Sequence, residues 1–417
     1  MNAEASTRAI VWVILGCGVV AALHVGKAAI AAPMLQVDLQ LNLGEVGWLT
    51  GIFAVLGLFG GVPAGALVTA AGDRRMLLLG LGVMTLAGAA GAIAPSYPIL
   101  LASRLLEGLG FLLITVAGPA LLQRLTTGSQ RDMAFSLWSC FMPCGMAIAM
   151  LTGPLFHTWQ SFWWSSAGLA AAAALVVVFC VPRGATPGGQ RLRRMVEDIR
   201  RLLSSSGTSL LALCFALYSL MFFALFSFLP ILLMERMGVS HHSAGLLAAL
   251  ASAINASGNL AAGYLMARGA GRASLIVCAS SVMGVAGLGI FLGLFPALPT
   301  FVLCIFFSAV GGLIPATLLA SAPLLSPNAT LVPIAVGLIM QGSNLGQLLG
   351  PVAVGSVTAT FGWGAAGAVV MAAAMAACAI AVGLRRAFQR GGSSIQRPSD
   401  APQPAPAGPA KLEDQSS

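Results

Sequence analysis

The chain has 417 residues, of which 58% are hydrophobic and 8% are charged, with a mean hydropathy of +0.93. A soluble domain carries about 25% charged residues, so this composition excludes a soluble globular protein and indicates one embedded in a membrane. The net charge of +9 would suggest nucleic acid as a partner in a soluble protein. Here the placement of the basic residues accounts for it, and we expect no nucleic-acid binding.

Apolar runs long enough to cross a bilayer as helices, about 20 residues each, follow one another along the chain. Helices are expected because a backbone in lipid must satisfy its hydrogen bonds within its own segment. The sequence predicts twelve spans, at residues 9–35, 46–71, 76–96, 99–123, 133–156, 162–182, 208–234, 243–267, 273–294, 298–323, 330–355 and 363–384. We therefore expect an all-α membrane protein with twelve transmembrane helices.

Basic residues fall in every second gap between these spans. Eighteen of the 21 Lys and Arg residues lie in those gaps or in the two terminal segments, whereas the alternate gaps hold only Arg236. Basic loops stay on the cytoplasmic side, so both termini are predicted to be cytoplasmic, in a bacterial inner membrane. The loop 183–207 is basic and is expected to form a short amphipathic helix on the inner leaflet. The tail 391–417 is rich in Pro, Ala and Ser and is expected to be disordered.

The loop 183–207 divides the spans six and six, and the two halves repeat. Gly65 and Arg74 match Gly263 and Arg272 at an offset of 198 residues, and Gly153-Pro154 matches Gly350-Pro351 at an offset of 197. The sequence thus predicts two pseudo-symmetric six-helix bundles, residues 1–182 and 208–390, with a solute site between them, as secondary transporters have.

Three motifs resemble those of the major facilitator superfamily over residues 9–385. Its signature after the second helix, Gly-x-x-x-Asp-Arg-x-Gly-Arg-Arg, is matched in part by Gly65, Gly72, Asp73, Arg74 and Arg75, with Thr69 where the family has Asp. Its fourth-helix motif is matched by the run from Arg104 to Gly110, and its fifth-helix motif in part by Gly145 and Gly153-Pro154. The sequence around Lys27 and Glu107 is also similar to the cyanate or nitroimidazole transporter-like branch.

The resemblance implies a monomer that alternates access by rocking its two halves. In the family the missing Asp latches one state, and Asp73 is the candidate to replace it. We expect a gating role for the following residues: Gly65, Asp73, Arg74, Gly145, Gly153, Pro154, Gly350 and Pro351.

Four ionisable residues lie inside the predicted spans of the first half. His24 and Lys27 are three residues apart on the first span, and Arg104 and Glu107 are three apart on the fourth, so each pair shares a helix face. At about 1.5 Å of rise per residue, Lys27 and Glu107 lie at about the same depth. The family resemblance implies that the first and fourth helices both line the central cavity, so an ion pair between Lys27 and Glu107 is expected. Charges within a membrane commonly mark a solute or ion pathway.

The excess of positive charge in this cluster favours an anionic substrate, with Arg104 able to bind a carboxylate in a bidentate manner. Glu107 is the first candidate to carry a coupled proton and His24 the second. The alternative is a structural cluster that fixes the first helix against the fourth and never contacts substrate.

The second half has polar side chains but no charge inside its spans. Asn255 and Asn259 lie on the eighth span, and Gln341, Asn344 and Gln347 recur every three residues on the eleventh, where they are expected to form one stripe. Asn255, Gln341, Asn344 and Tyr218 are candidate substrate contacts. The alternative for such amides is adhesion between helices.

Taken together, these patterns predict a proton-coupled secondary transporter of a small, anionic organic solute. A proton-driven multidrug exporter and a membrane sensor that binds without transporting are the alternatives. No nucleotide-binding loop, nucleophile motif or metal-ligand spacing is present in the sequence, so we expect no enzyme, catalytic residue, metal or cofactor.

Overall fold

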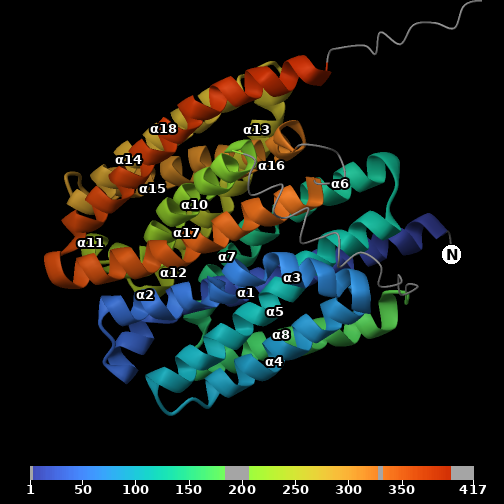
Figure 1. Cartoon of the computed structure of the whole chain (residues 1–417). Helices are drawn as coiled ribbons and strands as arrows, with labels where there is room; N and C mark the ends of the chain where they lie inside the picture. The colour runs from blue at the N-terminus through green and yellow to red at the C-terminus, as the bar shows by residue number, and fades with distance from the viewer. Residues whose placement is uncertain (1–2, 184–205, 327–331, 396–417) are drawn as a thin grey trace, which may run out of the picture.

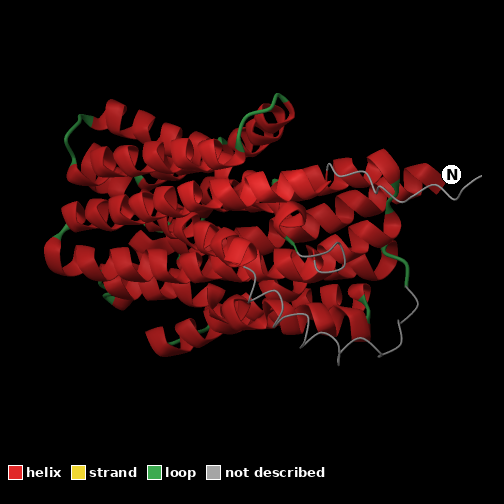
Figure 2. Cartoon of the chain, turned by 45° about the horizontal axis from the view of Figure 1, so that its top comes forward, coloured by secondary structure: helices red, strands yellow, loops and turns green. Residues whose placement is uncertain are grey.

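A computed structural model describes residues 3–183, 206–326 and 332–395. Within these ranges the secondary structure is helical and contains no strand (Figure 2). Ten of the described helices are long and apolar enough to cross a membrane, and a shorter apolar helix covers Phe141–Leu155. The predicted loop helix within 183–207 lies almost wholly outside the described residues.

The helices form twelve successive segments that match the predicted spans in order. The first half comprises α1 (Ala3–Leu39), α2 (Leu43–Gly51) with η1 (Ile52–Ala54) and α3 (Val55–Ala71), α4 (Asp73–Ala92), α5 (Tyr97–Leu125), α6 (Gly128–Ser139) with α7 (Phe141–Thr152) and η2 (Gly153–Leu155), and α8 (Trp159–Cys180). The second half comprises α10 (Ser206–Phe226) with α11 (Leu229–Met237), α12 (His241–Ala253) with α13 (Asn255–Ala267), α14 (Arg272–Leu292), α15 (Ala297–Gly311) with α16 (Leu313–Leu325), α17 (Val332–Phe361), and α18 (Trp363–Ile395).

The last helix continues to Ile395, so it includes the first five residues of the segment 391–417 that was predicted to be disordered. Residues 396–417 lie outside the described part of the chain. Below, the helix ends on the side of the N-terminus are called inner, following the predicted topology, and the opposite ends are called outer.

The helix ends follow local chemistry. Asn42 caps α2 by accepting a hydrogen bond from the Glu45 backbone, while the Glu45 carboxylate accepts one from the Asn42 backbone. Only Gly72 separates α3 from α4, and its φ of +92° lies in a region that residues with a Cβ atom rarely adopt. The glycine of the helix-2 signature is therefore required by the tight turn itself.

The two halves lie side by side and meet along α2, α3, α7, α12 and α17 (Figure 1). Each half is also tied at its outer end by the same device. The indole of Trp159, at the start of α8, donates to Asp38 near the end of α1 at 2.7 Å. The indole of Trp363, at the start of α18, donates to Glu235 near the end of α11 at 2.8 Å. We call these two contacts the outer clasps; they join the first and last spans of each bundle.

Candidate functional site

The four predicted ionisable residues come together inside the first bundle. Lys27 on α1 donates to Glu107 Oε1 on α5 at 2.5 Å, so the predicted ion pair is present. Arg104 donates to the other carboxylate oxygen of Glu107. One carboxylate therefore bridges two permanent cations, and the side chains of all three are completely buried.

His24 completes this cluster. Its Nε2 donates to the backbone carbonyl of Ser166 at 3.1 Å, and its Nδ1 lies 3.2 Å from both Lys27 Nζ and Glu107 Oε1. A neutral imidazole has one donor and one acceptor, so a ring that donates from Nε2 accepts from Lys27 at Nδ1. In that tautomer His24 adds no charge, and the cluster keeps one more positive charge than negative.

Two residues of α8 belong to the cluster and were missed by the sequence analysis. Ser166 Oγ accepts a hydrogen bond from Lys27 Nζ at 3.1 Å, and the same ammonium lies 4.5 Å from the centroid of the Trp163 ring. The three-residue spacing of Trp163 and Ser166 on the sixth span was the available signal, because it places both on one helix face.

Arg104 has an unfilled donor. Its Nη1 donates to the carbonyl of His24 at 2.8 Å, and its Nε donates to the carbonyl of Leu49 at 3.4 Å. Its buried Nη2 has no hydrogen-bond partner among the described residues. The ring of Phe53, in the short η1 segment that interrupts the second span, covers the guanidinium at 4.6 Å. A buried guanidinium nitrogen without an acceptor is costly, so Arg104 Nη2 can donate one further hydrogen bond to an acceptor.

In the second bundle, two of the four neutral candidates meet. The Asn255 amide donates to the Tyr218 hydroxyl at 3.3 Å and to the carbonyl of Ser308 at 2.9 Å. Asn259, one turn further on, donates to Asn255. Tyr218 and Asn255 are both buried. This group joins α10, α13 and α15 through neutral hydrogen bonds.

The predicted single stripe on the eleventh span was wrong. Gln347 faces α10 and donates to Ser343, which in turn contacts Ser219 at 2.9 Å. Gln341 and Asn344 instead pack against Gly61 and Gly57 of α3. A step of three residues falls short of a full turn by about 60°, so residues 341 and 347 point about 120° apart. The two faces of α17 therefore serve different neighbours.

The paired glycine and proline residues predicted for gating have matching positions in the two halves. Gly153 packs against α1 at Ile30, and Gly350 packs against α10 at Leu220. The following prolines contact glycines of the opposite half. A Cβ on Gly245 would lie 2.5 Å from Pro154, and one on Gly47 would lie 2.3 Å from the Pro351 carbonyl. These two contacts hold the bundles together at their outer ends.

The remaining gating candidates lie within the first bundle. Gly145 packs against the α1 backbone at Val19, and Gly65 lies within α3. At the inner ends, Asp73 forms an ion pair with Arg124 at 2.7 Å. Arg74 donates to the carbonyls of Val178 and Val181 at the end of α8. The Asp73 carboxylate thus joins α4 to α5, and Arg74 joins α4 to α8.

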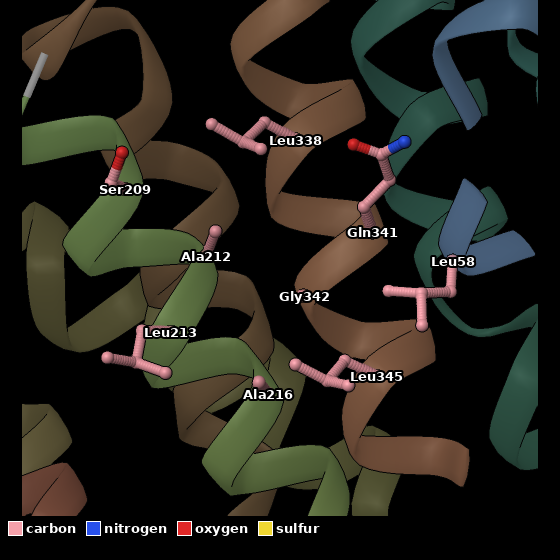
Figure 3. A pocket seen from close by; sticks show the side chains of 9 residues that line it. All are labelled: Leu58, Ser209, Ala212, Leu213, Ala216, Leu338, Gln341, Gly342 and Leu345. Carbon is pink, nitrogen blue, oxygen red and sulfur yellow. The ribbon is translucent and has the colours of Figure 1, made fainter. Parts of the chain in front are cut away.

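A pocket of about 310 Å³ lies in the angle between α3 and α10, with α17 forming its floor (Figure 3). Its lining is aliphatic apart from Gln341 and Ser209. The residues are Leu58, Ser209, Ala212, Leu213, Ala216, Leu338, Gln341, Gly342 and Leu345. Leu58 belongs to the first half and the others to the second, so the pocket spans the junction between the bundles. Among the site candidates from the sequence, Gln341 alone contributes to it.

Two six-helix halves, a repeated glycine–proline contact between them and charge buried within one bundle define a multi-pass membrane protein of the secondary-transporter class. The sequence profile of the Major Facilitator Superfamily matches residues 14–291 and 211–413. The chain therefore belongs to this superfamily.

One relative is the 3-(3-hydroxy-phenyl)propionate transporter of Escherichia coli, 28% identical over 58% of this chain and 61% of its own length. Another is the methyl viologen resistance protein SmvA of Salmonella typhimurium, 29% identical over 36% of this chain and 30% of its own. The matched regions thus span less than two thirds of either relative.

Among solved structures, a bacterial homologue of the human lysosomal transporter Spinster has a similar fold. In its inward-facing and occupied conformation it superposes with a TM-score of 0.70, at 17% identity, over 94% of this chain and 99% of its own. This likeness confirms the twelve-helix fold that the sequence predicted.

Proposed function

We propose that this protein is a proton-coupled secondary transporter that moves a small organic anion across the bacterial inner membrane. It works as a monomer, with both termini in the cytoplasm, and alternates access by rocking its two six-helix halves. The proposal rests on the buried cluster of His24, Lys27, Arg104 and Glu107, in which two permanent cations share one carboxylate and Arg104 Nη2 has no acceptor.

Electrostatics favour an anion at this cluster. Bringing a carboxylate to Arg104 would supply the missing acceptor and balance the excess positive charge, and a guanidinium binds carboxylates through two parallel hydrogen bonds. Phe53 covers the guanidinium in the present conformation, so access requires the second span to move. The E. coli relative named for a propionate supports the same substrate class.

Proton coupling is assigned to Glu107 and His24. The Glu107 carboxylate accepts hydrogen bonds from Lys27 and Arg104. It also accepts one from His24 when Nδ1 of that imidazole carries a proton. A proton arriving at the cluster therefore changes which of these three residues donates to Glu107. An anionic substrate at Arg104 would compete with Glu107 for the guanidinium. This competition supplies a physical link between substrate and proton, because neutralising Glu107 releases Arg104 to bind the anion.

The decisive experiment measures uptake of 3-(3-hydroxyphenyl)propionate into proteoliposomes, with and without an imposed pH gradient. We expect Lys27→Ala and Arg104→Ala each to weaken substrate binding, and Glu107→Gln to bind substrate but to lose stimulation by the gradient. Glu235→Gln, at the outer clasp of the second bundle, is the matched carboxylate control. Gradient-driven uptake by Glu107→Gln at the wild-type rate would refute the assignment of coupling to Glu107. Unchanged affinity in both cation variants would make the cluster structural.

Export of drug-like compounds is the second candidate, because other relatives are named as a methyl viologen resistance protein and a tetracenomycin C resistance and export protein. The excess positive charge of the cluster opposes a cationic drug. Methyl viologen should therefore neither stabilise the protein nor be transported. Transport of this dication, unaffected by Lys27→Ala, would favour the exporter and reduce the cluster to a structural role.

A further inference from the structure

The pocket between α3, α10 and α17 combines an aliphatic wall with one free carboxamide (Figure 3). We infer that it receives the ring of a monocyclic, amphipathic substrate, with Gln341 binding a hydroxyl or carbonyl group on that ring. This inference rests on the proposed transport of a small organic solute and narrows its chemical class. It concerns residues outside the charge cluster.

The volume selects the size of the occupant. A cavity of about 150 Å³ lined by aliphatic side chains accommodates a benzene molecule. The pocket has about 310 Å³ and is open on one side, which leaves space for a ring with a short side chain. Small-molecule sites range from about 300 to 1,000 Å³, so the pocket lies at the small end of that range.

The lining selects the polarity of the occupant. No charged side chain contributes to the wall, and the polar members are Gln341 and Ser209. A carboxylate inside this wall would lose its hydration without gaining a partner cation, which is costly. The charged end of a substrate therefore lies outside the pocket, whereas its uncharged ring lies within it.

Gln341 is available for such a ligand. Its carboxamide makes no hydrogen bond with a described residue, and its side-chain stem rests on Gly61 of α3. An amide offers both a donor and an acceptor, so it can bind either a phenolic hydroxyl or a carbonyl. Gln341 is thus a specificity-determining contact, and its loss should matter only for ligands that carry such a group.

The position of the pocket links occupancy to the rocking motion. Leu58 is supplied by the first bundle and the rest of the wall by the second, and α17 packs against both α3 and α10. A ligand that fits between Leu58 and α10 contacts both bundles. It will bind one arrangement of the bundles better than the other, which is the requirement for a substrate to shift the conformational equilibrium.

The test measures ligand-induced thermal stabilisation of the purified full chain, since a ligand that binds only the folded state raises the melting temperature. The probes are propionate, 3-phenylpropionate, 3-(3-hydroxyphenyl)propionate, 3-(2-naphthyl)propionate and the uncharged 3-phenylpropan-1-ol. The variants are Ala212→Leu, which fills the pocket, Leu338→Ala, which enlarges it, and Gln341→Leu, which removes the amide. Ala172→Leu, on the exposed face of α8, is the matched control.

We expect Ala212→Leu to weaken the binding of 3-phenylpropionate by about tenfold or more. One methylene too many in an apolar pocket changes affinity by about 10- to 200-fold. Leu338→Ala should strengthen the binding of 3-(2-naphthyl)propionate. This second variant keeps the test valid if Ala212→Leu does not fold. Gln341→Leu should weaken the binding of 3-(3-hydroxyphenyl)propionate by about three- to tenfold, which is the effect of one hydrogen bond. It should leave the binding of 3-phenylpropionate unchanged. Ala172→Leu should behave as wild type.

Failure of this inference and failure of the proposed function differ in outcome. If the acids bind wild type and all pocket variants alike, the pocket assignment is overturned and the anion proposal stands. If only the alcohol binds, and Ala212→Leu weakens it, the pocket assignment stands and the anion proposal fails. A bound phospholipid that Ala212→Leu displaces, seen by native mass spectrometry, would assign the pocket to an acyl chain and overturn the inference. Stabilisation by none of the probes overturns both.

Discussion

The two bundles share their packing but differ in their buried polar groups. Both use an outer clasp between a carboxylate and an indole, and both place a glycine–proline pair against the other half. The first bundle buries two permanent cations and a carboxylate, whereas Tyr218 and Asn255 join the second through neutral hydrogen bonds. The two halves thus share packing contacts but not buried charges, and within the described residues the buried ion pairs are confined to the first half.

The largest effect should come from removing the charge balance of the first bundle. Glu107→Gln leaves Lys27 and Arg104 buried without a counter-ion, and breaking a buried ion pair in this way costs about 3–5 kcal/mol. We expect a marked fall in the melting temperature of the purified protein. Gln347→Leu, which removes a neutral buried amide from the second bundle, is the comparison.

Equal falls in melting temperature for Glu107→Gln and Gln347→Leu would show that the two bundles depend equally on their buried polar groups. A smaller fall for Glu107→Gln at alkaline pH would support the difference between the bundles. The Lys27 ammonium can release its proton there, which relieves the charge imbalance left by the missing carboxylate.

An intermediate effect should come from the contacts that the halves share. Gly47→Leu inserts a side chain where a Cβ alone would approach the Pro351 carbonyl to 2.3 Å, so the outer ends of α2 and α17 must separate. Overpacking of this kind costs about 1–3 kcal/mol, which shifts the protein towards arrangements open on the outer side. Spin labels at Gln40 and Thr360 should report a longer distance between the bundles.

Gly245→Leu acts at the equivalent contact with Pro154 and should produce a shift in the same direction. If only one of the two substitutions opens the outer side, the two contacts are not functionally equivalent. Gly168→Leu, where nothing lies within 4 Å of the added Cβ, should leave the distance unchanged.

The smallest effect should come from the neutral group of the second bundle. Tyr218→Phe removes the hydroxyl that accepts from Asn255, while the amide keeps its bond to the Ser308 carbonyl. The net contribution of such a hydrogen bond is about 1 kcal/mol, so the melting temperature should fall only slightly. A loss as large as that of Glu107→Gln would show that the second bundle depends on its polar group as strongly as the first.

Most of the fold could be predicted because the bilayer constrains it so strongly. Span length, the need to satisfy the backbone within each segment and the alternation of basic gaps place all twelve segments to within a few residues at most ends. The exceptions were the ends of α1, α17 and α18 and the start of α6, where the helices extend beyond the apolar run. The interruption η1 at Ile52–Ala54 was not predicted, because no proline or polar run marks it in the sequence.

The candidate site was predictable where one helix face decides it. Lys27 and Glu107 were placed together by their equal depth and by the family's placement of the first and fourth helices, and they do form an ion pair. Trp163 is completely buried beside Lys27, whereas the adjacent Trp164 is 51% exposed. The spacing of Trp163 and Ser166 places them on one face of the sixth helix, but the sequence does not reveal that this face is the one packed against α1. For the same reason, the pocket beside Gln341 was beyond prediction.

The outer clasps have a mechanical consequence. Each one fastens the first helix of a bundle to the last at a single end, as a hoop closes the rim of a barrel. A rim closed in this way resists splaying, so in the proposed rocking each half would tilt as a stiff body whose outer end keeps its shape. The glycine–proline contacts lie beside these rims. If the two halves pivot there, small adjustments at the outer ends would become larger displacements at the inner ends.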